Sequence, residues 1–100
     1  MSILDKDFGC REITVDGLEG LGFQYMKHAA TNINGVNCTT YQFFIKLSSF
    51  IMAYHEFTYL PELNELRVKV NVDAWRCRRE YKINPSCLED IIIEINRYRN

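Results

Sequence analysis

The segment Leu66-Arg67-Val68-Lys69-Val70-Asn71-Val72 alternates apolar and polar side chains without a break. Successive side chains of a β-strand point to opposite faces of a sheet, so this period of two predicts a strand with one buried face. The side chains expected to point inward are Leu66, Val68, Val70 and Val72. This strand decides the fold, because it needs neighbouring strands to pair with and a second layer of secondary structure to bury its apolar face.

A second alternating segment runs from Trp75 to Ile83. Asp73-Ala74 leaves room only for a tight reversal, so the two segments predict an antiparallel hairpin. The side chains expected on its outward face are Arg76, Arg78, Glu80 and Lys82, and those expected on its apolar side are Trp75, Cys77, Arg79, Tyr81 and Ile83. Arg79 is unusual there, because a guanidinium on the core side needs a hydrogen-bond acceptor.

Three more strands are predicted before this hairpin, at 23–28, 39–47 and 50–60. Helix is the competing prediction for 51–59, where aromatic and β-branched content favours a strand. The middle one places aromatic and aliphatic side chains on one face, while Gln42, Phe44 and Lys46 lie on the other. Residues 29–37 are predicted to form a long turn with Asn34-Gly35 at its tip, and 61–65 a second turn.

Two helices complete the pattern. Thr14 is expected to cap a short helix that Gly22 ends, and Asn84-Pro85 is expected to open a second helix. An apolar stripe of the second helix comprises Leu88, Ile91, Ile92 and Ile95 and is expected to dock on the sheet. The acidic residues expected to face water on this helix are Glu89, Asp90 and Glu94.

The predicted fold class is therefore α+β: a short N-terminal helix, an antiparallel meander sheet of about five strands, and a C-terminal amphipathic helix packed on one face. A length of 100 residues fits one domain, 1–100, with residues 1–12 as an irregular arm. A composition of 47% hydrophobic and 25% charged residues excludes a chain that is mainly disordered.

The sequence predicts a cytoplasmic protein without membrane contact. Asp5 and Asp7 interrupt the place where a signal peptide needs a basic end and an apolar run, and no window approaches the ~18 apolar residues of a membrane span. Four widely spaced cysteines, Cys10, Cys38, Cys77 and Cys87, are expected to be free thiols.

Neither a cofactor nor a metal site is predicted, and we expect no catalysis. His55-Glu56 begins an H-E-x-x-H pattern, but its fifth position is Tyr59, and no glycine loop could hold a phosphate. Cys38 with His55, or Cys77 with His28, would be conceivable nucleophile pairs. The sequence places neither pair together and offers no third group to orient the base.

The predicted binding residues lie mainly on the hairpin. Its candidate cations are Arg67, Lys69, Arg76, Arg78 and Lys82, in a chain whose net charge is −1. Such a stripe could follow phosphates, or it could be the solvated face of a one-sided sheet, where long cations also discourage edge pairing. Phe44, on the outward face of its strand, is a candidate protein contact.

The run Leu18-Glu19-Gly20-Leu21-Gly22-Phe23, followed by hairpins and a C-terminal amphipathic helix, resembles small uncharacterised proteins encoded in phages and mobile elements of gut bacteria. These commonly open with a helix closed by a Gly-Phe pair and end with a helix on the sheet. The resemblance covers most of the chain as an outline, and its one motif is the Leu-Gly-Phe step. The long first turn and the aromatic middle depart from it. It implies an accessory or interaction role at most.

Two functions therefore follow as hypotheses. The first is a small non-catalytic intracellular accessory protein that presents a sheet face or edge to a protein partner. The alternative is a nucleic-acid-binding module that uses the basic hairpin face.

Overall fold

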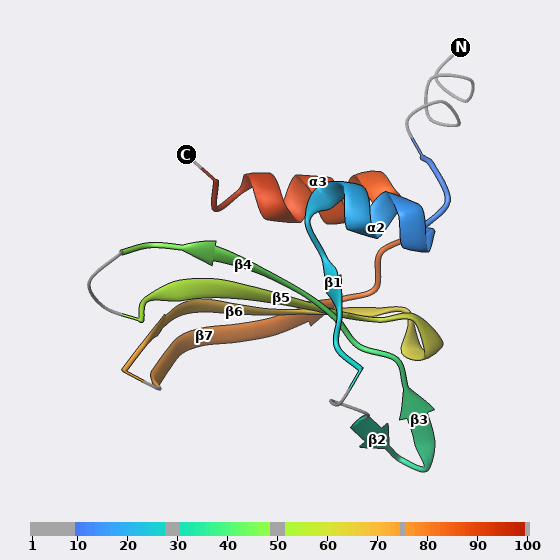
Figure 1. Cartoon of the computed structure of the whole chain (residues 1–100), viewed down its shortest axis with the longest axis horizontal. Helices are drawn as coiled ribbons and strands as arrows, with labels where there is room; N and C mark the ends of the chain where they lie inside the picture. The colour runs from blue at the N-terminus through green and yellow to red at the C-terminus, as the bar shows by residue number, and fades with distance from the viewer. Residues whose placement is uncertain (1–9, 28–30, 49–51, 75, 100) are drawn as a thin grey trace.

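The structure, a computed structural model, describes residues 10–27, 31–48, 52–74 and 76–99. Helices α2 (Val15–Leu21) and α3 (Leu88–Asn96) lie on the same side of a five-stranded antiparallel sheet (Figure 1). The predicted α+β class, with a short first helix and a closing helix on the sheet, is confirmed.

The sheet has the strand order β1-β4-β5-β6-β7. Its strands are β1 (Gln24–Tyr25), β4 (Tyr41–Lys46), β5 (Tyr54–Leu60), β6 (Glu65–Asp73) and β7 (Arg76–Ile83). The last four form a meander, in which the 3₁₀ turn η1 (Pro61–Leu63) joins β5 to β6. Of the predicted first strand, 23–28, only the two residues of β1 pair with the sheet, and His28 lies outside the described residues.

The stretch 29–37, predicted as a long turn, contains more structure than expected. Strands β2 (Thr31–Ile33) and β3 (Val36–Cys38) form a separate two-stranded hairpin. Its tip is the predicted one, since Asn34 and Gly35 both adopt a positive φ. The polar composition hid these strands, because neither has an apolar face to bury. In Figure 1 the hairpin lies on the side of the sheet away from the helices.

The apolar side of the sheet faces the two helices. Cross-strand register places Phe43, Phe57, Val68 and Tyr81 in one row, with Tyr41, Tyr59, Leu66 and Ile83 in the row beside it. Ile91 and Ile95 of α3 are 0% and 2% exposed, so the helix closes the core as the stripe predicted. The four residues of β6 that were expected to point inward are all buried: Leu66, Val68, Val70 and Val72.

A β-bulge interrupts the pairing of β5 with β6. Phe57 pairs with Val68, but Tyr54 pairs with Val72, so β6 carries one extra residue in this interval. Asn71, within the interval, has a φ of 54°. Asn tolerates the left-handed conformation better than β-branched residues do, and a bulge of this kind bends the strand and increases its twist.

Helix α3 begins later than predicted. Its N-cap is Cys87 rather than Asn84, whose side-chain amide instead donates to the carbonyl of Asn64 at 2.9 Å. The Asp90 carboxylate accepts from the backbone N–H of Ser86 at 2.8 Å. The segment before the helix therefore contacts the turn between η1 and β6. A rule based on local capping residues cannot detect this contact, because Asn64 and Asn84 are far apart in sequence.

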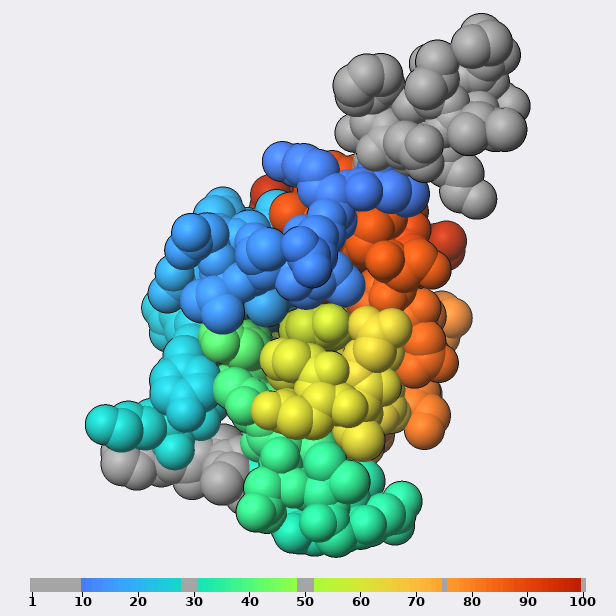
Figure 2. Space-filling view, turned by 90° about the vertical axis from the view of Figure 1, so that its right-hand side faces the viewer, coloured from blue at the N-terminus to red at the C-terminus, as the bar shows by residue number. Residues whose placement is uncertain are grey.

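The end of the predicted arm is tied to α3. Residues 1–9 of the arm lie outside the described residues. The Arg11 carbonyl accepts from the N–H of Leu88 at 2.7 Å, and the Arg11 guanidinium lies 2.6 Å from the Glu89 carboxylate. Figure 2 shows this segment and α2 lying against α3 above the η1 turn.

Helix α2 has the predicted caps. The Thr14 hydroxyl accepts from the N–H of Gly17, and Gly22 closes the helix with a φ of 106°. A Cβ on Gly22 would lie 2.8 Å from the Phe43 ring, whereas a Cβ on Gly20 would have no neighbour within 4 Å. Gly22, just after the helix, is therefore required by its backbone conformation and by the Phe43 ring, whereas Gly20, inside the helix, is not.

We expect Gly20→Ala and Gly22→Ala to change stability in opposite directions. Alanine at 20 should stabilise the protein by about 0.5–1 kcal/mol through helix propensity. Alanine at 22 should destabilise it by at least about 1–2 kcal/mol, because it forces an L-residue into the left-handed region against a ring. Urea unfolding followed by circular dichroism measures both, and equal effects would contradict this role of Gly22.

Candidate binding surface

The predicted cations of the hairpin fall into two groups with different electrostatic surroundings. Arg67 of β6 and Lys82 of β7 are Cα partners in the register, and both approach the Glu65 carboxylate. The Arg67 Nε lies 3.5 Å from Glu65 Oε1, and the Lys82 Nζ lies 3.1 Å from the same oxygen. Glu65 is buried, so two cations compensate one buried acid.

Lys69 belongs to the same group. Its ammonium lies 4.0 Å from the Glu56 carboxylate of β5, and its register partner on β7 is Glu80. Arg67, Lys69 and Lys82 therefore share the outward face of the sheet with three glutamates. Because each cation there has an acid beside it, this half of the face presents little net charge.

The second group is Arg76, Arg78 and Arg79, near the start of β7. All three are exposed, and none has an ion pair within the part of the chain that the structure describes. Arg79 pairs in register with Val70, on the side of the apolar rows, where the sequence predicted it. Its guanidinium lies over the Tyr81 ring, 4.8 Å from the centroid. Because Arg79 is exposed at the rim of the sheet, this cation–π contact takes the place of the buried hydrogen-bond acceptor expected from the sequence.

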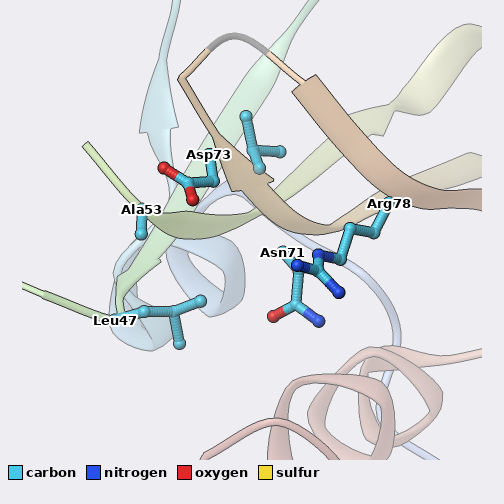
Figure 3. Close-up of a pocket in the computed structure, with 6 residues that line it drawn as sticks. Leu47, Ala53, Asn71, Asp73 and Arg78 are labelled. Carbon is cyan, nitrogen blue, oxygen red and sulfur yellow. The ribbon is translucent and has the colours of Figure 1, made fainter. Parts of the chain in front are cut away.

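A shallow hollow of about 280 Å³ lies beside this group. Leu47, Ala53 and Val72 supply apolar walls, and Asn71, Asp73 and Arg78 supply polar groups. Figure 3 shows the Arg78 guanidinium close to the Asn71 amide and Asp73 on the other side of the hollow. In Figure 1 this end of the sheet extends past the C-terminal end of α3, so the helix does not cover it.

Phe44 is on the outward face of β4 and is 47% exposed. Its ring meets the Tyr54 ring edge-on at a centroid distance of 5.5 Å. Register places Phe44 across from Glu56, which in turn lies across from Lys69. Phe44 is therefore on the same face as the compensated cations, and β5 and β6 separate its strand from β7. It does not belong to the arginine group.

A polar cluster that the sequence did not predict lies between α3 and the sheet. Glu94, expected to face water, is 7% exposed. The Tyr81 hydroxyl donates to its carboxylate, and the Tyr81 and Tyr98 hydroxyls are 2.6 Å apart. Arg97 lies 3.1 Å from the other Glu94 oxygen. The signal for this burial was the spacing, since Glu94 follows Ile91 by three positions and Tyr98 follows Glu94 by four.

The cluster is saturated with hydrogen bonds, which suits a structural role. Burial, the hydrogen bonds to Glu94 and Tyr98, and the nearby Glu94 charge raise the pKa of Tyr81 above its ordinary value. The hydroxyl therefore stays protonated and remains a donor to Glu94 at physiological pH. A buried carboxylate needs such partners, because an unpaired buried charge is costly.

His55 sits in the apolar row between Ile45 and the bulge. Its Nδ1 accepts from the backbone N–H of Asn71 at 3.0 Å, and its ring packs 5.0 Å from the Tyr98 ring. Burial lowers the pKa of His55. The imidazole thus secures the β-bulge in its neutral form, because a proton on Nδ1 would face the Asn71 N–H.

The conceivable nucleophile pairs gain no support from these contacts. The Cys38 thiol donates to the Val36 carbonyl, and the His55 acceptor nitrogen is occupied by Asn71. The Cys77 thiol donates to the Arg79 carbonyl, and its suggested partner His28 lies outside the described residues. No disulfide joins any of the four cysteines.

No protein-family model matches the chain, and searches of curated proteins and of solved structures each find no match. Among the described residues, no helix has the length and apolar character needed to cross a bilayer. The same residues contain no group of three or more potential His, Cys, Asp or Glu metal ligands.

We expect stability to fall as the pH drops below about 6.5, and His55→Gln to reduce this loss. The folded pKa of His55 is lowered, so the unfolded state binds the proton more readily. The stabilisation is complete above the unfolded pKa and is lost as pH falls through the folded pKa. A glutamine carbonyl can still accept from Asn71 but does not titrate in this range.

Urea unfolding of both proteins between pH 8 and pH 5 measures the difference, which has a ceiling of about 1.4 kcal/mol per pH unit for one group. Any other titrating group acts equally in both proteins, so their difference isolates position 55. Identical pH profiles would contradict the assigned role of His55.

Proposed function

We propose that this protein is a small non-catalytic intracellular accessory protein that binds a protein partner through the β7 side of its sheet. The observation that carries the proposal is the group formed by Arg76, Arg78 and Arg79. These cations are exposed on the last strand of the sheet, past the end of α3. None of them forms an ion pair among the described residues, although Asp73 is the register partner of Arg76, whereas Arg67, Lys69 and Lys82 each approach a carboxylate.

The contrast between the two cation groups supports binding rather than solvation alone. A cation whose role is only to keep a sheet face solvated can have a carboxylate beside it, and Arg67, Lys69 and Lys82 each have one. Arg76, Arg78 and Arg79 form no ion pair among the described residues, so Asp73, the register partner of Arg76, offsets their mutual repulsion only in part. That repulsion is relieved when a partner supplies negative charge.

A nucleic-acid-binding module is the second candidate, and the same three arginines favour it, because guanidinium groups bind phosphate well. It ranks second because Glu65 and Glu56 approach Arg67, Lys69 and Lys82, which shortens the cationic stripe that a phosphate backbone would follow. Of the five cations predicted to follow phosphates, only Arg76 and Arg78 have no acid within ion-pair distance in the described part.

The outline of the molecule supports the same reading. A helix, an antiparallel sheet and a closing helix are the features shared with the small phage and mobile-element proteins that the sequence resembles. That resemblance implies an accessory role, and an origin in a phage or mobile element remains part of the proposal.

The proposal is tested by comparing Arg76→Glu/Arg78→Glu with Lys27→Glu/Lys46→Glu. Both double variants change the net charge equally, and all four positions are exposed. Each protein is immobilised and exposed to extract of the producing cell, with nuclease-treated extract as a parallel sample. We expect the wild type and the lysine variant to retain the same protein, and the arginine variant to lose it.

Two outcomes would count against this function. Retention of the same protein by the arginine variant would show that these arginines do not bind it. Loss of all retention after nuclease treatment, together with an affinity for DNA or RNA that falls with salt by about 0.9 log units per phosphate contact and log unit of salt, would establish the nucleic-acid alternative.

A further inference from the structure

β7 is an open edge of the sheet. The strand order ends at β7, which is eight residues long and pairs with β6 on one side only. On the other side, alternate N–H and C=O groups of an edge strand have no strand to bond. Five consecutive residues of β7, Arg76 to Glu80, are exposed, so neither helix covers this part of the edge.

The opposite edge of the sheet is less suitable for a partner. There β1 pairs with Tyr41 and Gln42 of β4, which leaves only the range 43–46 of that strand without β1 beside it. The remaining length is half that of β7. An added strand gains main-chain hydrogen bonds in proportion to its length, so β7 offers the larger site.

The charge on β7 selects what can pair with it. The strand carries four cations, Arg76, Arg78, Arg79 and Lys82, and one acid, Glu80. A second copy of the chain would bring the same positive strand to the edge, and like charges across two strands are destabilising. An acidic strand meets the opposite situation, because opposite charges across neighbouring strands attract.

The spacing of the arginines sets a requirement on the partner. Arg76 and Arg78 are two residues apart on one strand, so their side chains leave the same face about 6.8 Å apart. A partner strand with acidic residues at alternate positions presents carboxylates with the same repeat. Arginine is suited to this role, because its planar guanidinium can bind a carboxylate with two hydrogen bonds.

We propose that β7 accepts an extended acidic segment of another protein as an additional strand of the sheet. The main-chain groups of β7 bind the backbone of that segment, while Arg76 and Arg78 bind its alternating carboxylates. This inference rests on the proposed function and specifies its partner.

The test uses three synthetic ten-residue peptides with blocked ends. One alternates glutamate with valine, the second has the same side chains but N-methyl groups on alternate backbone nitrogens, and the third replaces glutamate with lysine. Each is titrated into the ¹⁵N-labelled full chain at about 0.1 M salt, where surface charges are screened only beyond about 10 Å. The amide shifts of β7 are compared with those of β4.

We expect the first peptide to shift amides along β7 and the lysine peptide to shift none. N-methylation should weaken binding at least about tenfold, the loss that follows when several main-chain hydrogen bonds are removed. Arg76→Gln/Arg78→Gln should weaken the first peptide's binding, and Lys27→Gln/Lys46→Gln should leave it unchanged.

Equal binding of the N-methylated peptide would overturn strand addition but leave a charge-based protein contact, and with it the proposed function, in place. Shifts confined to β4, or no shift with any peptide at millimolar concentration, would also overturn the inference. Concentration-dependent shifts of β7 without peptide would assign the edge to a second copy. Stronger shifts with a single-stranded oligonucleotide of equal charge would assign it to nucleic acid.

Discussion

The packing of α3 against one face of the sheet is the contact on which the other features depend. The sheet has a single apolar side, and Leu88, Ile91 and Ile95 exclude water from its centre. Full burial of a side chain of this size contributes roughly 1.5–3 kcal/mol. Without this cover, the rows that contain Phe57 and Val68 would be open to solvent.

The same packing explains the polar cluster. Once α3 lies on the sheet, the Glu94 carboxylate is largely removed from water and is compensated by Tyr81 and Arg97, with Tyr98 bonded in turn to Tyr81. It also explains where the molecule is open. Helix α3 ends before the sheet does, so the β6–β7 end and the outer edge of β7 stay uncovered.

The main elements of this fold could be predicted because their signals are local. Alternation from Leu66 to Val72, the stripe at Ile91 and Ile95, and Gly22 after a helical turn each report on neighbours along the chain. The β2–β3 hairpin and the start of α3 at Leu88 were missed. The hairpin was missed because its strands are polar and have no apolar face to bury. The start of α3 depends on a partner distant in sequence, the Asn64 carbonyl that accepts from the Asn84 side chain.

The candidate site was predicted only as a set of cations. Sequence placed Arg76 and Arg78 with Arg67, Lys69 and Lys82 in one stripe, because alternation gives the face but not the neighbours on other strands. The acids that separate the two groups, Glu56 and Glu65, come from a different strand and from the start of β6. Similarly, Glu94 was predicted to face water, because the sequence does not show that Tyr81, on a strand of the sheet, lies beside it.

Amide hydrogen exchange, followed residue by residue by NMR at neutral pH, tests the central claim most directly. The claim is that α3 covers the apolar face of the sheet while β7 remains an edge strand, unpaired on one side. Slow exchange throughout β5 and β6, with fast exchange at every second amide of β7, is the expected pattern. Continuous protection along the whole of β7, or fast exchange in β6, would contradict the architecture described above.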